Sequence, residues 1–305
     1  MKRVATAAVL IPLVLLLVFR GPFWLMPLVL AVLALGCIVE YEHLVEAKGI
    51  RIRKRLLRWF AIAPFVLPFA FAAWPEIPLE AGFVVALVIV VLLAPFCFVV
   101  AHMWSDLEEC LVSAGVSTLG LLYISVSLAC LWNLWDQQFG SLFVFFVLAV
   151  VWSGDIAAYY TGKNLGRTKL APRISPGKTW EGAIASLVVS VALGAWILLA
   201  LEPQHSWLVA HELISQVDIS GWRRPIPHYP WWFAVGAPAL VNVAAQLGDL
   251  VESAMKRSAN VKDSGTILPG HGGLLDRIDA LLFASPMAVL VFAVGDAIIP
   301  LTIIR

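Results

Sequence analysis

The stretch "GHGGLLDRIDALLFASPMAVLVFAVG", residues 270–295, joins a charged loop directly to a long apolar run. Two aspartates and an arginine lie among its first ten residues, whereas no charged residue occurs from Ala280 to Gly295. A membrane-spanning helix needs about 20 largely apolar residues, and this run supplies most of that length. The stretch therefore predicts a spanning helix whose first turn places charged groups at the edge of a lipid bilayer.

The whole chain has the composition of a membrane protein. Of its 305 residues, 61% are hydrophobic and only 13% are charged, and the mean hydropathy is +0.90. Soluble domains carry about 25% charged residues, so the composition excludes an ordinary soluble protein. The formal net charge of +1 gives no information on partners.

Apolar runs along the chain predict an all-α, polytopic integral membrane protein with about nine transmembrane helices. We find no internal repeat and no separate soluble segment, so residues 1–305 are expected to form a single membrane domain. The second and third runs can also be interpreted as one re-entrant hairpin. The expected spans are residues 4–19, 22–40, 57–74, 81–101, 112–134, 139–160, 181–201, 231–250 and 279–303.

Lysine and arginine gather in three loops, at residues 41–58, 161–180 and 251–278. With nine spans these loops fall on one side of the bilayer, and the positive-inside rule assigns that side to the cytoplasm. The 41–58 segment is interpreted as an anchor that also attracts anionic lipid. Glu40 and Glu42, at the end of the second expected helix, are interpreted as polar capping at the interface, with a supporting role near the site as the alternative.

Aspartates at the ends of the last two expected spans suggest a metal site. If the eighth helix continues past residue 250, Asp249, Ser253 and Lys256 share one of its faces. Asp276 and Asp279 share a face at the start of the ninth helix. Carboxylates at a bilayer edge are costly, roughly 2.5–3.5 kcal/mol each, so they need partners. Three carboxylates of this kind suit Mg²⁺.

The loop between these helix ends, "KDSGTILPGHGG", is glycine-rich and basic. A glycine turn before a helix N-terminus presents amide donors to phosphate, which makes Gly272 and Gly273 candidate phosphate contacts beside Lys262. The alternative is a tight turn within a solvated basic loop. His271 can cap the helix, bind phosphate or transfer a proton, and we favour phosphate contact.

The second basic loop, "SGDIAAYYTGKNLGRTKLAPRISPGKTWEG", begins with Asp155 in or near the end of the sixth span. Its Gly-Lys-Thr triplet is not a phosphate-binding P-loop, because a membrane helix rather than a strand precedes it. Ser175 and Thr179 are typical of a helix start. Lys178 either clamps substrate or pairs with Glu181, and both interpretations remain open.

Residues 253–279 resemble the signature of the phosphatidate cytidylyltransferase (CDP-diacylglycerol synthase) family. The segments "QLGDLVESAMKR" and "ISPGKTWEG" are also similar to the family's patterns, and the resemblance is specific over residues 154–181 and 246–279. The 202–230 loop resembles nothing known of the family. The matching positions are Ser253, Met255, Lys256, Arg257, Lys262, Asp263, Gly265, Leu268, Pro269, His271, Gly272, Gly273, Leu274, Asp276, Arg277, Ile278 and Asp279.

The resemblance implies a membrane transferase that condenses CTP with phosphatidic acid, giving CDP-diacylglycerol and pyrophosphate for phospholipid biosynthesis. It implies Mg²⁺, with K⁺ as a candidate second metal, and an inner (cytoplasmic) membrane location with the active site facing the cytoplasm. The implied partners are both substrates and the lipid bilayer, without nucleic acid, and a homodimer is compatible with this interpretation.

The resemblance also suggests roles for the candidate residues. Phosphatidate is already ionised, so charge neutralisation and positioning account for most of the expected catalysis. The expected metal ligands are Asp249, Asp276 and Asp279; the expected catalytic residues are Lys256, Arg257, Lys262, His271 and Arg277; the expected substrate contacts are Asp155, Ser175, Lys178, Glu181, Ser253, Gly272 and Gly273.

Two other functions fit parts of the sequence. A lipid kinase would share a phosphate site at the membrane edge, although such kinases lack the full signature. A transporter or flippase would place its carboxylates near the bilayer midplane, in repeated halves. Here the carboxylates cluster toward one side of the expected bilayer.

Overall fold

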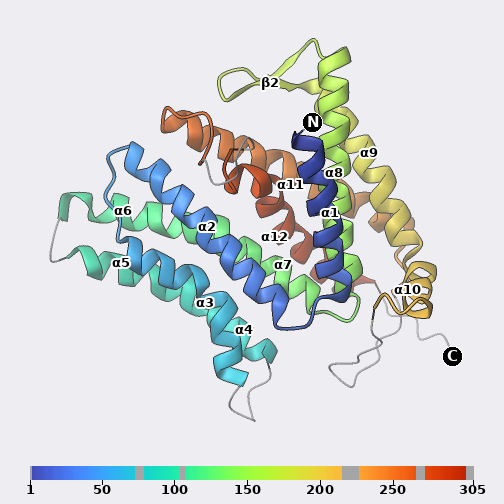
Figure 1. Ribbon diagram of the computed structural model, residues 1–305, viewed down its shortest axis with the longest axis horizontal. Helices are drawn as coiled ribbons and strands as arrows, with labels where there is room; N and C mark the ends of the chain where they lie inside the picture. Colours follow the sequence, from blue (N-terminus) through green and yellow to red (C-terminus); the bar gives the residue numbers. More distant parts are fainter. Residues whose placement is uncertain (1, 73–78, 104–106, 215–226, 266–271, 300–305) are drawn as a thin grey trace. The chain divides into compact units, whose positions relative to one another are not determined.

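The computed structural model describes residues 2–72, 79–103, 107–214, 227–265 and 272–299. These residues are mostly helical, which confirms the all-α, polytopic prediction (Figure 1). Seven of the described helices are long and apolar enough to cross a membrane. They span Leu25–Ala47, Ala81–His102, Leu107–Trp135, Gly140–Leu165, Trp180–Leu199, Trp231–Ser258 and Leu275–Ile298.

Two of the nine expected spans are not among those seven helices. The run at 4–19 forms helix α1 (Lys2–Arg20), of which Val9–Arg20 is a shorter apolar helix. The run at 57–74 forms helix α3 (Lys54–Ala72), which begins with basic residues and contains Pro64 and Pro68. Both helices exist as expected, and the count of nine spans is not confirmed by the residues that the structure describes.

The chain divides into two compact units, and helices α1, α7, α11 and α12 contribute residues to both. Unit 1 comprises residues 1–3, 23–132 and 254–278. The prediction of one domain over residues 1–305 stays a prediction. Besides the ends of shared helices, unit 1 contains α2 (Leu25–Ala47), α3, α4 (Leu79–Val88), the π-helical η1 (Ile89–Leu93), α5 (Ala94–His102), α6 (Leu107–Gly120), the π-helical η2 (Leu121–Val126) and most of α7 (Ser127–Trp135).

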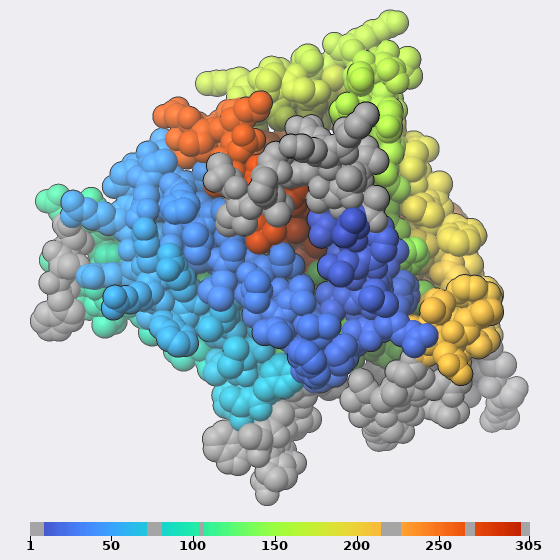
Figure 2. Space-filling model, in the orientation of Figure 1, coloured from blue at the N-terminus to red at the C-terminus, as the bar shows by residue number. Residues whose placement is uncertain are grey.

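Unit 2 comprises residues 4–22, 133–253 and 279–305. A two-stranded antiparallel hairpin follows the end of its longest complete helix, where the sequence predicted only a loop (Figure 1). The residues of this region, coloured yellow-green in Figure 2, lie at the surface. Part of the expected 202–230 loop is also a helix. The elements of unit 2 are most of α1, α8 (Gly140–Leu165), β1 (Lys169–Ala171), β2 (Ser175–Thr179), α9 (Trp180–Leu199), α10 (Leu201–Ala210), and the larger parts of α11 (Trp231–Ser258) and α12 (Leu275–Ile298).

Polar contacts fasten α2 to its neighbours in unit 1. Arg58 donates two hydrogen bonds to the buried Glu42 carboxylate, at 3.0 and 2.6 Å. Lys54 forms an ion pair with Glu46 at 2.6 Å. The basic segment after α2 therefore binds the acidic end of that helix, beyond any role as a membrane anchor. Glu42 is a structural partner of α3 rather than an interfacial cap.

A buried polar seam joins α8, α9 and α11 in unit 2. Asn242 donates to the hydroxyls of Ser186 and Ser190, each at 2.9 Å. Ser190 in turn donates to the Val150 carbonyl at 2.7 Å. A Cβ atom at Gly154 would lie 2.6 Å from the Asn242 amide nitrogen, so α8 passes very close to α11. The seam lies next to Asp155 in sequence and two turns before Asp249.

Candidate active site

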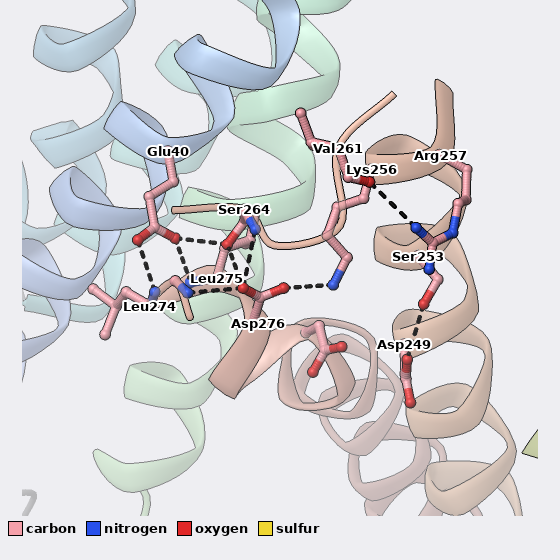
Figure 3. A network of polar contacts seen from close by, with 12 residues as sticks. Glu40, Asp249, Ser253, Lys256, Arg257, Val261, Ser264, Leu274, Leu275 and Asp276 are labelled. Atoms are coloured by element: carbon pink, nitrogen blue, oxygen red, sulfur yellow. Dashed lines mark hydrogen bonds and ion pairs between the residues drawn. The ribbon is translucent and has the colours of Figure 1, made fainter. Parts of the chain in front are cut away.

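The first cluster of charged side chains lies in unit 2, at the C-terminal part of α11. The Lys178 ammonium lies 2.6 Å from the Asp249 carboxylate. Ser253 donates a hydrogen bond to the same carboxylate at 3.4 Å (Figure 3). Asp155 lies close enough to Asp249 and Lys178 for an electrostatic interaction with both side chains. Helix α11 continues to Ser258, as the shared face of Asp249 and Ser253 required. The cluster brings four expected site residues together.

The hairpin places Lys178 in this cluster. Strands β1 and β2 pair antiparallel, with Lys169 opposite Thr179. Thr179 caps helix α9, because its hydroxyl accepts a hydrogen bond from the Gly182 N–H at 3.2 Å. The helix-start prediction is thus correct for Thr179 but wrong for Ser175, which lies in β2.

Glu181 has a different partner from the one that the sequence suggested. Its carboxylate accepts the Thr168 N–H at 3.1 and 3.3 Å, which ties the start of α9 to the chain entering the hairpin. Lys178 pairs with Asp249 instead of Glu181. The simple Lys178–Glu181 ion pair was therefore wrong, because the strand that precedes α9 turns the lysine toward α11.

Asp279 lies at a close approach of α12 to α11 in unit 2. A Cβ atom at Gly248 would stand 2.6 Å from the Asp279 carbonyl oxygen and 3.1 Å from the Phe283 Cβ. Only glycine permits this approach, since any larger residue would push the helices apart. The backbones that carry Asp249 and Asp279 are thus adjacent, as the predicted metal site requires.

The second cluster lies in unit 1 and is centred on Asp276 (Figure 3). One oxygen of its carboxylate accepts hydrogen bonds from the Gly273 N–H at 2.8 Å, the Ser264 N–H at 3.0 Å and the Ser264 hydroxyl at 3.0 Å. The other oxygen binds the Lys256 ammonium in a short ion pair. The two side chains are only 13% and 10% exposed, so this is a largely buried pair.

Glu40, near the end of α2, completes the network in unit 1. Its carboxylate accepts the N–H groups of Leu274 and Leu275, both at 2.8 Å, and the Ser264 hydroxyl at 2.9 Å. The side chain is buried, with 1% exposure. The interpretation as interfacial capping was wrong for Glu40, because the side chain is buried against the start of α12, and the supporting role near the site stays a prediction. Its sequence signal was an acidic residue inside an otherwise apolar run.

The helix N-terminus therefore already holds anions in this structure. Glu40 and Asp276 accept hydrogen bonds from the three consecutive amides of Gly273, Leu274 and Leu275, and Gly273 is one of the two glycines expected to contact phosphate. Gly272 has a φ of +79°, a left-handed conformation that suits glycine. Phosphate contact at Gly272 and Gly273 stays a prediction.

The remaining basic candidates lie nearby in unit 1. Lys262, Arg257 and Arg277 are exposed, and Arg257 also donates to the Val261 carbonyl at 3.4 Å. His271 lies outside the described residues. These three exposed cations are close in sequence to Lys256, Ser264 or Asp276, and exposed cations of this kind suit contact with phosphate groups.

The oxygen-rich donor set fits a hard divalent cation in chemistry. Within the described ranges, however, no group of three or more His, Cys, Asp or Glu side chains is arranged around one point. Asp249 and Asp276 are each paired with a lysine ammonium. The lysines thus supply positive charge at two of the three carboxylates predicted to bind Mg²⁺.

Long apolar helices with aspartate–lysine pairs at helix ends define a polytopic membrane protein whose polar groups suit phosphate chemistry. The chain matches the model of the "Cytidylyltransferase family" over residues 1–294. It is similar to a phosphatidate cytidylyltransferase of Bacillus subtilis, at 31% identity over 96% of this chain and 97% of the relative. The chain therefore belongs to the cytidylyltransferase family, and it is an enzyme of the nucleotidyltransferase class.

Other relatives match over a smaller part of their length. A phosphatidate cytidylyltransferase of Brucella suis is 39% identical over 60% of this chain and 57% of the relative. One of Thermotoga maritima is 36% identical over 64% of each chain. The family resemblance predicted from residues 253–279 is thus confirmed.

Proposed function

We propose that the protein is a phosphatidate cytidylyltransferase, which transfers CMP from CTP to phosphatidic acid and makes CDP-diacylglycerol for phospholipid biosynthesis. The observation that carries this proposal is the pairing of Lys256 with Asp276 and of Lys178 with Asp249 at the ends of apolar helices. A lipid phosphate and a water-soluble nucleotide can meet only where hydrocarbon borders water. Similarity to the Bacillus subtilis relative over nearly the full chain supports the same activity.

In the proposed reaction, a phosphate oxygen of phosphatidate attacks the α-phosphorus of CTP. A new P–O bond forms while the bond between the α-phosphorus and the bridging oxygen breaks, and pyrophosphate leaves with the electron pair. Both reactants are anions, so their approach needs positive charge, and donors placed before the reaction cost no reorganisation during it. The lipid phosphate and the leaving pyrophosphate are bound by Lys256, Arg257, Lys262, Arg277 and His271.

The nucleotide is proposed to bind on the unit 2 cluster. Lys178 extends from the hairpin beside Asp155 and Asp249. Its ammonium can exchange its carboxylate partner for a CTP phosphate, and Ser253 and Ser175 supply hydroxyl donors. Glu181 holds the hairpin base through Thr168, so its contribution to nucleotide binding is to position the strand.

Mg²⁺ is the proposed cofactor, with K⁺ as a candidate second ion. Asp249, Asp276 and Asp279 would hold it, and when bound it would neutralise the triphosphate and the departing pyrophosphate. Lys178 and Lys256 balance Asp249 and Asp276 when the ion is absent, which lowers the cost of keeping carboxylates near the membrane.

The proposed location is the cytoplasmic membrane, with the site facing the cytoplasm. The basic segments at 41–58, 161–180 and 251–278 support this orientation through the positive-inside rule. CTP is then available from the cytosol and phosphatidate from the inner leaflet. The reaction needs no second subunit chemically, and a homodimer is compatible with it.

A labelling experiment tests the function directly. The detergent-purified protein is incubated with phosphatidate and CTP carrying label on either the α- or the γ-phosphate, with Mg²⁺ or with a chelator. Label from the α-phosphate is expected in the lipid, only with Mg²⁺ present. Transfer of γ-label alone would instead identify a lipid kinase. Uptake of substrate into vesicles without any chemical change would favour a transporter.

A further inference from the structure

We propose that Glu40 is a positioning residue of this enzyme, because its carboxylate is the internal anion around which the glycine loop before α12 is folded. Through that loop Glu40 sets the position of Asp276 and Lys256. The inference rests on the proposed function and deepens it by adding a residue that positions the site. Glu40 lies in α2, more than 200 residues before the loop that it organises.

The first argument is the hydrogen bonding of the Glu40 carboxylate. One oxygen accepts the Leu274 N–H, and the other accepts the Leu275 N–H and the Ser264 hydroxyl, all within 2.9 Å. A buried carboxylate is tolerated only where such donors replace water. The N-terminus of α12 supplies two of them and a favourable dipole. The burial of Glu40 is thus explained by the loop.

The second argument is the space that two glycines leave for this carboxylate. A Cβ atom at Gly265 would lie 2.5 Å from one Glu40 oxygen, and a Cβ atom at Gly273 would lie 2.4 Å from the other. Both distances are far below van der Waals contact. The glycines therefore form a cradle whose shape fits the Glu40 side chain, which is a feature separate from the hydrogen bonds.

The third argument is the connection to Asp276. The Ser264 hydroxyl lies 2.9 Å from a Glu40 oxygen and 3.0 Å from an Asp276 oxygen, and it has a single proton for both. The Ser264 N–H binds the same Asp276 oxygen. Any shift of Ser264 that follows a change at Glu40 is therefore passed to Asp276, and from there to Lys256.

The test compares two buried glutamates on the same helix. Glu40→Gln keeps the size of the side chain but turns one acceptor into a donor that faces an amide N–H. We expect kcat to fall about 100-fold, as small displacements of catalytic groups do, while the CTP KM changes less. Glu42→Gln is the matched control: Glu42 is equally buried but binds Arg58. It should lower the Tm and leave kcat within about threefold.

A second measurement does not depend on activity. Hydrogen exchange of peptides that cover residues 261–278 should become faster in Glu40→Gln, and should stay as in the wild type in Glu42→Gln. If the wild type transfers no CMP, the proposed function fails, but faster exchange still supports the Glu40 cradle. Unchanged exchange together with an unchanged kcat overturns the inference. So does an equal loss of kcat in both variants, which would show a role in stability alone.

Ser264→Ala keeps the inference testable if Glu40→Gln does not fold. It removes the shared hydroxyl and leaves both backbone contacts of Glu40 in place. We expect at least a tenfold lower kcat at a nearly unchanged Tm. When both single variants fold, the double variant Glu40→Gln/Ser264→Ala should be little worse than Glu40→Gln, because both act through one path. Wild-type kcat in Ser264→Ala contradicts the proposal.

Discussion

The two aspartate–lysine pairs of this enzyme have the same chemistry but very different support. In unit 1, Asp276 and Lys256 are 10% and 13% exposed, and the aspartate accepts three further hydrogen bonds. In unit 2, Asp249 and Lys178 are 36% and 24% exposed, and Ser253 adds one long hydrogen bond. The first pair is built into a loop and a helix start, whereas the second joins a hairpin to a helix.

This difference indicates that the two pairs have different roles in the site. A largely buried pair costs much to break, because loss of one partner leaves an uncompensated charge, so it suits a fixed part of the site. A half-exposed pair is screened by water and contributes little stability, so its lysine can change partners when an anion arrives. We therefore expect the unit 1 pair to be preorganised and the unit 2 pair to exchange with substrate.

The largest expected effect is that of Asp276→Asn. The amide can no longer balance Lys256, and it offers a donor where Gly273 and Ser264 also donate. Loss of one partner of a buried pair should lower the free energy of unfolding by about 3–5 kcal/mol. CMP transfer should fall below detection, and thermal unfolding in detergent gives the stability. A variant as stable as the wild type would show that the pair is not preorganised.

Asp249→Asn is expected to separate activity from stability. The Lys178–Asp249 pair is partly exposed, so the free energy of unfolding should change by no more than about 1 kcal/mol. Activity should still fall by roughly 100-fold or more, because the mutation removes the carboxylate that pairs with Lys178 and that is proposed to hold Mg²⁺. When activity is measured over a range of Mg²⁺ concentrations, the variant should need a higher concentration for half-maximal activity than the wild type. A loss of stability as large as in Asp276→Asn would remove the distinction between the two pairs.

Gly273→Ala tests whether the backbone of the loop around Asp276 matters more for activity than the hairpin beside Lys178. Its Cβ atom would lie against the Ser264 hydroxyl and 2.4 Å from Glu40, so the loop must move. We expect at least a tenfold loss of activity, because Asp276 moves with that loop. Gly177→Ala, in the hairpin beside Lys178, is the control: its Cβ atom would have no neighbour within 4 Å. If both variants keep full activity, the loop geometry does not matter for turnover.

Particular residues show how far the sequence could predict this site. The apolar runs predicted the helices, because membrane burial leaves few choices for the backbone. The family was predicted from the resemblance of residues 253–279 to its signature. The partners of Glu40 and Lys178 could not be predicted. Glu40 meets a loop that follows it by more than 200 residues, and Lys178 is turned by a short hairpin whose residues read as a loop. Such pairings depend on tertiary packing rather than on local pattern.

The smallest expected effect is that of Glu181→Ala. This variant tests whether the hairpin contributes to CTP binding or to turnover. Loss of the two contacts with Thr168 should loosen the strand that carries Lys178 and raise the CTP KM by roughly two- to threefold, with turnover nearly unchanged. Glu46→Ala is the control, since Glu46 is an exposed glutamate paired with Lys54 in unit 1. Initial rates over a range of CTP concentrations separate binding from turnover. If turnover instead drops roughly 100-fold, Glu181 contacts the substrate itself, and the hairpin contributes a second acidic group to the site and not only a well-placed lysine.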